Sequence, residues 1–585
     1  MNACLYVGRV GGLALALGVG AAVLGGTAAA WADDDSPPPS ASETRSVATD
    51  TRSDSAAVGT SRRSVAAGPA RAVKLASSTA SAKPAAAVPA SVRAAERVRP
   101  SAAVQIVDTA PSAPSQAPAE PLSAQPLALA ATAPTQPLIL GPSGVPIPSA
   151  EYVSKVMQFY VTPNSPGGTL TPQAVFTPEG LYPITGVKSL PLNTSVNQGL
   201  TILSDTLALL PGGTQTTVFG YSQSAIIGAL LQKQGNPEAP PTIPENLRDT
   251  ISFVFVGNEM NPNGGFLSRF PGLDLPSLGL PFYGATADDA YPTINYTREY
   301  DGFADFPRYP LNFLSVLNAG MGIVYVHTKY VPNAKCQTFC LTEQEVLDAT
   351  PLPSESPTQN YFFIPTENLP LLQPLRLLPL IGNPLADLIQ PVLKVIVDLG
   401  YADPAHGFST ATQPPANLQV PFGLFPEVSP LEVLSRLVDG VGQGISDFIA
   451  AFGPTGSIAR ELSAIALPSL PTDILPIPTD PITAVQQWLT STANGISAAL
   501  ASLYSGFLPT ADIVNAISIS LPAYDVALVL EGVKQILGGD VIGGLVNAIG
   551  LPLAANVGLV TTASLVGALV WAQSFAGLFG ITVGS

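Results

Sequence analysis

The spacing of apolar residues along the middle of the chain predicts alternating strands and helices. Residues 216–219 and 250–256 are β-branched and aromatic runs, as expected of buried strands. Apolar side chains recur at helical spacing between these runs, over 225–231, and before the first of them, over 195–210. This order of strands and helices predicts an α/β protein with a doubly wound, mainly parallel sheet.

Further elements are expected on both sides of this centre. They are strands at 137–140, 294–300 and 322–326, and helices at 150–160 and 311–319. The segment 257–293 shows no clear period. Because long loops in compact domains are often functional, we expect it either to cover the mouth of a site and contact an acyl chain or to pack as an ordinary excursion.

The junction between one predicted strand and the next helix carries a candidate nucleophile. Ser222 lies there between Gly220 and Ser224, so the pattern is G-x-S-x-S where a nucleophile elbow usually has G-x-S-x-G. A three-position match alone is weak in a chain with 52 Gly, but the strand before it and the helix after it supply the context that the motif needs. The backbone N–H of Gln223, at the start of that helix, is then a candidate oxyanion donor.

A second oxyanion donor is expected from the Gly-rich loop at 141–146, which follows the strand at 137–140. In α/β-hydrolases a loop after an early strand supplies this donor. The candidate is therefore Ser143 or Gly144, and an ordinary turn is the alternative interpretation.

Two aspartates are candidates for the acid of a Ser-Asp-His triad. Asp301 and Asp305 both follow the expected strand at 294–300, where an acid lies on the same edge of the sheet as the serine. We prefer Asp305, because residues 302–305 resemble the G-x-x-D turn that often carries this acid. Asp301, the alternative acid, is then expected to hold the turn by an Asx-type hydrogen bond.

The chain has two histidines, and His327 is the candidate base. It follows the expected strand at 322–326 and preserves the order Ser, Asp, His along the chain. His406 is the competitor, in a turn-like stretch at 401–407 that has no expected strand end before it. A lone histidine is more often structural than catalytic, so the order along the chain decides the choice.

With these residues identified, the segment 137–427 resembles the PE-PPE domain family of mycobacteria, serine α/β-hydrolases similar to cutinases. The matching stretches are 220–225, 257–258, 262–265, 300–307, 317–320 and 325–327. That family is named for N-terminal PE or PPE helical modules, in place of which we expect only a signal peptide and a linker here.

The resemblance implies an esterase or lipase that hydrolyses acyl esters or lipids without a cofactor. The triad would be Ser222, one of Asp301 and Asp305, and His327. A close branch is similar to acyltransferases that build cell-envelope glycolipids, so transfer of an acyl chain to a sugar such as trehalose is a second expectation. A third, from a different class, is an envelope or surface binding protein that keeps the fold with a silent site.

The N-terminal part of the chain is expected to direct export. Residues 1–32 combine one charge, an apolar run and an A-x-A type site, as a signal peptide does; a retained membrane anchor is the alternative. Residues 33–136 are rich in Ala, Ser, Pro and Thr, which predicts a disordered linker. We therefore expect a secreted or cell-envelope protein. Its net charge of −16 argues against nucleic acid as a partner.

The remaining features concern cysteines and the C-terminal region. Cys336 and Cys340 are expected to form a local disulfide, and no metal site is expected because neither histidine lies near them at ligand spacing.

Residues 428–585 have a helical pattern, without charge from 541 onwards. Within that stretch 557–579 approaches the length of a membrane helix, but its Thr, Ser and Gln residues favour a buried or lipid-surface helix over a span. Membrane or envelope association is therefore expected through 541–585.

Overall fold

The computed structural model describes residues 135–165, 170–233, 242–287, 291–333, 336, 338–464 and 480–578. The expected signal peptide, at 1–32, and nearly all of the expected linker lie outside these residues. The linker was predicted to end at residue 136, but Thr135 already forms parallel bridges with Leu170 and Gln215. The Gln136 N–H donates to the carbonyl of Gln215 over 2.9 Å.

A seven-stranded sheet forms the centre of the fold. In sheet order the strands are β2 (Gln173–Ala174), β1 (Leu138–Ile139), β3 (Thr216–Tyr221), β4 (Ile251–Val256), β7 (Thr293–Arg298), β9 (Gln359–Ile364) and β8 (Thr350–Leu352). All neighbours pair in parallel except β8 and β9. The chain order reverses between β1 and β3, which confirms the predicted doubly wound α/β-hydrolase fold. Active sites of such folds lie at the carboxyl ends of the strands near this reversal.

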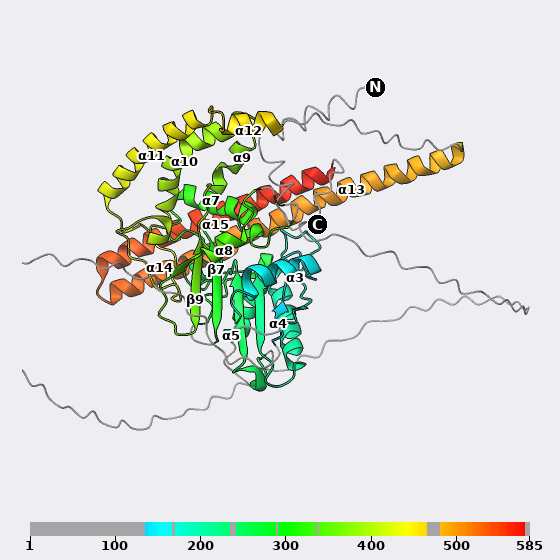
Figure 1. Ribbon diagram of the computed structural model, residues 1–585, viewed down its shortest axis with the longest axis horizontal. Helices are drawn as coiled ribbons and strands as arrows, with labels where there is room; N and C mark the ends of the chain where they lie inside the picture. The colour runs from blue at the N-terminus through cyan, green and yellow to red at the C-terminus, as the bar shows by residue number, and fades with distance from the viewer. Residues whose placement is uncertain are drawn as a thin grey trace, which may run out of the picture. The chain divides into compact units, whose positions relative to one another are not determined.

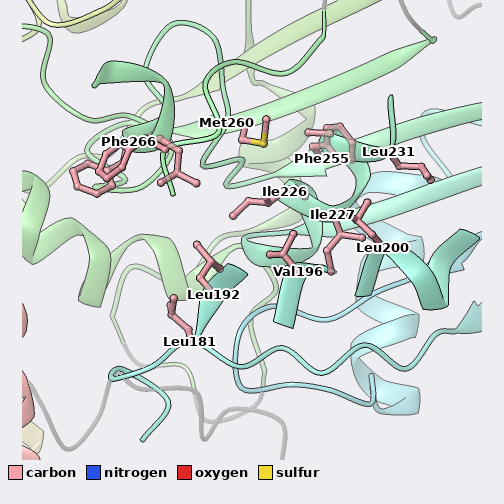
Figure 2. Packing of buried hydrophobic residues seen from close by; sticks show 14 of the residues in the cluster. Leu181, Leu192, Val196, Leu200, Ile226, Ile227, Leu231, Phe255, Met260 and Phe266 are labelled. Atoms are coloured by element: carbon pink, nitrogen blue, oxygen red, sulfur yellow. The ribbon is translucent and has the colours of Figure 1, made fainter. Parts of the chain in front are cut away.

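Alternate residues of the central strands face opposite sides of the sheet, as the period of two requires. The helices on the two faces are α4 (Leu192–Ala208), α5 (Gln223–Lys233) and α3 (Ala150–Val156), the last extended by a π-helical turn, Met157–Val161. Val218 and Phe255 pack with α4 and α5, whereas Phe219 and Val256 pack with α3. Figure 2 shows Ile227 of α5 close to the side chains of α4. The helices predicted at 150–160 and 195–210 are thus confirmed within a few residues.

The prediction of a strand at 322–326 is wrong. Residues predicted as a helix at 311–319 and a strand at 322–326 form a single helix, α7 (Phe313–Tyr325), whose N-terminus is capped by the side chain of Asn312. A Cβ at Gly322 would lie 1.8 Å from the backbone oxygen of Tyr300. Glycine therefore allows α7 to pack directly on the turn after β7. The last parallel strand of the sheet is instead β9, which the sequence pattern did not predict.

The C-terminal region is helical over its described residues, as predicted. Its helices are α11 (Pro430–Ala450), α12 (Ser457–Ala464), α13 (Pro481–Asn515), α14 (Leu521–Leu537) and α15 (Val541–Leu578), and α10 (Gly382–Asp398) precedes it. α11 packs along α10, and α13 and α14 both pack along α15 (Figure 1). The remaining short elements are α6 (Phe266–Arg269), α8 (Glu343–Leu347), α9 (Gln373–Arg376), β5 (Asp274–Leu275) and β6 (Leu280–Pro281). The predicted disulfide between Cys336 and Cys340 is present.

We expect Gly322→Ala to destabilise the protein, because its methyl group would overlap the Tyr300 carbonyl, and overpacking of this kind costs about 1–3 kcal/mol. The matched control is Gly442→Ala in α11, where a methyl group meets no atom within 4 Å and should stabilise the helix by roughly 0.5–1 kcal/mol. Urea unfolding of both variants measures the difference. Equal midpoints for the two would show that α7 does not depend on this contact.

Candidate active site

The candidate residues gather at the carboxyl ends of three neighbouring strands. Ser222 follows β3, Glu259 lies three residues after β4, and Asp301 lies three residues after β7. Because these strands are parallel and adjacent, the segments that follow them meet at one edge of the sheet. His327 reaches the same edge from another direction, at the start of a short 3-10 turn, His327–Lys329, that directly follows α7 and its C-cap.

The turn around Ser222 has the geometry of a nucleophile elbow. Ser222 has a backbone φ of +58°, a strained value for a residue other than glycine. A Cβ at Gly220 would lie 2.7 Å from the Ser224 carbonyl oxygen, so that position must lack a side chain. Ser224 fits where glycine is usual because its hydroxyl accepts from the Tyr221 N–H over 2.8 Å and donates to the Tyr221 carbonyl over 3.0 Å. The G-x-S-x-S pattern therefore forms the same turn with an added local hydrogen bond.

Ser222, His327 and Asp301 form a continuous chain of contacts. The Nε2 of His327 lies 2.8 Å from the Ser222 Oγ, and its Nδ1 lies 2.8 and 2.9 Å from the two carboxylate oxygens of Asp301. The Asp301 carboxylate also accepts from the Tyr330 hydroxyl over 2.8 Å and from the Phe303 N–H over 2.9 Å. All three members are buried. These bonds fix the acid and orient the imidazole towards the serine.

The preference for Asp305 as the partner of His327 is wrong. Asp305 accepts from the Tyr300 N–H over 2.8 Å and contacts Nε2 of His406 at 2.9 Å. The reason is the turn itself, in which the Asp305 N–H donates to the Asp301 carbonyl and the Asp305 side chain folds back to hold the turn. His406, the competing histidine, bridges Asp305 and Asp403. Burial alone would lower its pKa, but these two carboxylates raise the pKa well above the usual 6.5.

Gln223 and Ser143, the predicted oxyanion residues, are in contact. The Gln223 side chain donates to the Ser143 Oγ over 3.0 Å and to the Gly180 carbonyl over 2.7 Å, and it accepts from the Ser195 hydroxyl over 2.6 Å. The N–H groups of the first turn of a helix have no partner within the helix, so the backbone N–H of Gln223, the first residue of α5, stays the candidate oxyanion donor. Gly144, the other candidate, donates its N–H to the carbonyl of Glu179.

Glu259 is a site residue that the sequence analysis missed. It is buried, and its carboxylate accepts from the Ser222 hydroxyl over 3.2 Å, so it shares that hydroxyl with His327. Its signal in the sequence is its place just after the buried strand at 251–256, the same reasoning that identified the aspartates.

The charged groups of the site shift one another's pKa values. Burial alone would raise the pKa of Asp301, but attraction to His327 and its hydrogen bonds lower the pKa below its usual range. Burial alone would lower the pKa of His327, but attraction to Asp301 and Glu259 raises it. Burial raises the pKa of Glu259 to about 7 and that of the nearby Glu179 to about 8. Such shifted values are typical of functional sites. Across the described ranges, no group of three potential ligands is arranged to hold a metal ion.

Comparisons with known proteins show what the chain is similar to. A family model described as the PE-PPE domain matches residues 168–402. The PPE family protein PPE28 of Mycobacterium tuberculosis is 47% identical over 447 residues, 74% of this chain and 65% of that protein. From the same species, "Esterase PE16" is 39% identical over 52% of this chain and 54% of its own length.

A more distant relative from that species is "Diacyltrehalose acyltransferase Chp2", 28% identical over 39% of this chain and 65% of its own length. The chain thus spans between about half and two thirds of the length of these relatives. The predicted resemblance to the PE-PPE domain family is confirmed for residues 168–402, while the wider limits 137–427 and a separate region from 428 stay predictions. Residues 168–402 match the PE-PPE domain, and the chain is similar to proteins of the PPE and PE families.

Proposed function

We propose that the protein is a serine-dependent enzyme that hydrolyses acyl esters. The observation that carries this proposal is the chain of contacts in which His327 lies 2.8 Å from both the Ser222 Oγ and the Asp301 carboxylate. The relative named as an esterase supports the same reaction class. Asp301, not Asp305, takes the role of the acid.

The reaction follows from the geometry. Ser222 attacks the acyl carbonyl while His327 accepts its proton and then passes it to the leaving alcohol. Asp301 holds the imidazole in the tautomer that leaves Nε2 free to accept. The Gln223 N–H at the start of α5, with the loop of Ser143, stabilises the oxyanion. Water then attacks the acyl-serine, releasing the acid and restoring the hydroxyl.

The second candidate function is acyl transfer. The observation that favours it is the similarity to a relative named as a diacyltrehalose acyltransferase. A sugar hydroxyl would then replace water in the second step, with the same residues in the same roles. Product analysis with and without trehalose separates the two reactions. A binding protein with a silent site is the third candidate, and it predicts a folded chain that no serine-directed reagent labels.

We also propose a location in the cell envelope or outside it, reached through the segment 1–32. Two helical stretches, Ile482–Leu537 and Val541–Leu578, are long and apolar enough to cross a membrane. Gly558 of α15, however, lies against Phe270 and Pro310 of the α/β-hydrolase part, so one side of this helix packs on protein. We therefore favour contact with a lipid surface through 541–585 over a membrane span.

The first test is labelling with a short-chain alkyl fluorophosphonate together with turnover of an aryl ester. We expect wild-type protein to be labelled and Ser222→Ala not to be. Asp301→Asn should lower turnover by about 10³–10⁴-fold, because the histidine then adopts the wrong tautomer.

Asp305→Asn is the matched control for that variant. Its partner is His406, so we expect it to lower the unfolding midpoint while turnover per folded molecule stays within a few-fold of wild type. A large loss of turnover in Asp305→Asn with a small loss in Asp301→Asn would reverse the assignment. A folded wild type that is neither labelled nor active would favour the binding protein.

The second test concerns pH. The negative charge of Glu259 raises the pKa of His327, and a histidine must be neutral to accept the serine proton. Glu259→Gln removes this charge, so the acid limb of kcat/KM against pH should move to lower pH, by on the order of one unit. Glu245→Gln, at an exposed acid, should leave the profile unchanged. An acid limb that stays in place or moves to higher pH in Glu259→Gln would contradict the coupling.

A further inference from the structure

An apolar cavity lies between the α/β-hydrolase part of the chain and the C-terminal helices. It holds about 100 Å³ that the centre of a water-sized sphere can occupy, several times the roughly 10–15 Å³ that one water needs. Residues before 428, among them Leu181 and Phe303, form one wall. Ile513, Leu521 and Leu559, from α13, α14 and α15, contribute to the other.

The cavity is lined in part by residues that contact the triad. Glu259, which lines it, accepts from the Ser222 hydroxyl. Phe303, another lining residue, has its ring centroid 4.9 Å from that of His327. Glu259 is the one charged residue among the described residues of the lining. A molecule in this cavity would therefore have one end at the nucleophile and the rest against apolar side chains.

The C-terminal wall is part of the fold. The Tyr182 hydroxyl donates to the Asp512 carboxylate, and the Ser277 hydroxyl donates to the Asp512 carbonyl over 2.8 Å. Leu521 and Leu559 belong to the same buried cluster as residues of α4 and α5. Described residues before and after 428 also fall in one compact unit. The helices are thus held where they line the cavity.

Polar side chains that line the cavity already have hydrogen-bond partners within the protein, so they offer few hydrogen bonds to a polar ligand. The Tyr182 hydroxyl is bonded to Asp512, the Thr562 hydroxyl donates to the carbonyl of Gly558, and Glu259 is bonded to Ser222. Water is poorly held in a cavity without free hydrogen-bonding partners, whereas a hydrocarbon chain gains contacts there. Leu181 and Leu192, which both line the cavity, belong to the buried hydrophobic cluster whose side chains are drawn in Figure 2.

We propose that this cavity binds the hydrocarbon part of a fatty acyl ester, and that α13, α14 and α15 are therefore a wall of the substrate site. The proposal rests on the proposed esterase function. It specifies the substrate class as esters whose acyl chain is long enough to pass Phe303 and reach α15. Short acyl groups would use only the triad and the oxyanion donors.

The test fills the cavity from its C-terminal wall. Ala563, in α15, lines the cavity, whereas Ala568, five residues further along the same helix, is exposed. Full-length Ala563→Phe and Ala568→Phe are compared with wild type on p-nitrophenyl butyrate and decanoate, after equal labelling by a short-chain fluorophosphonate has been checked. We expect Ala563→Phe to lower kcat/KM for the decanoate at least tenfold and to change the butyrate less than twofold. Ala568→Phe should match wild type on both.

The outcomes separate the two proposals. A wild type that is folded but not labelled overturns the esterase function itself. Normal labelling, with Ala563→Phe matching Ala568→Phe on both esters, overturns the acyl cavity alone. An equal loss on both esters in Ala563→Phe also overturns it, because that loss reflects a general disturbance of the site and not a filled chain-binding cavity.

Discussion

The close contact between α7 and the turn after β7 is the constraint on which the candidate site depends. His327 comes from the end of a helix, so its position is set by how deeply that helix packs. Glycine at 302 and at 322 lets the two backbones approach to distances that a Cβ would block. The imidazole then meets the Asp301 carboxylate, which the same turn presents. The positions of the histidine and of its acid are therefore both fixed by a single packing contact.

A group of side-chain hydrogen bonds beside the serine holds three segments of the chain together. Gln223, the residue after the nucleophile, uses its side chain to join Ser143, Gly180 and Ser195, which come from three separate segments. Its backbone N–H is the proposed oxyanion donor, and in that proposal one residue both binds the oxyanion and holds the surrounding segments together. Donors held in this way need no rearrangement when charge develops on the substrate, which is the main source of electrostatic stabilisation in such sites.

Much of the sheet could be predicted from the sequence, because buried parallel strands such as β3 and β4 are continuous β-branched and aromatic runs. The position of Ser222 followed from the same pattern. The run from 313 to 325 was harder, since an apolar stretch with glycines suits a buried strand or a buried helix, and only its contact with the Tyr300 carbonyl decides. Asp301 and Asp305 lie on one turn. Which of them faces the histidine depends on the hydrogen bonds of that turn, which no local pattern records.

Both histidines of the chain are paired with buried carboxylates at nearly the same distance. A search of structures for imidazole and carboxylate at contact distance would therefore return two sites in this molecule, of which the one at His327 has a serine hydroxyl on the other ring nitrogen and the one at His406 has a second carboxylate. A search of sequences for G-x-S-x-G would return none at this turn, because Ser224 takes the place of the second glycine. Related hydrolases that share both features would be missed by the sequence search and counted twice by the structural one, so a structural search needs the serine hydroxyl beside the imidazole as a third criterion.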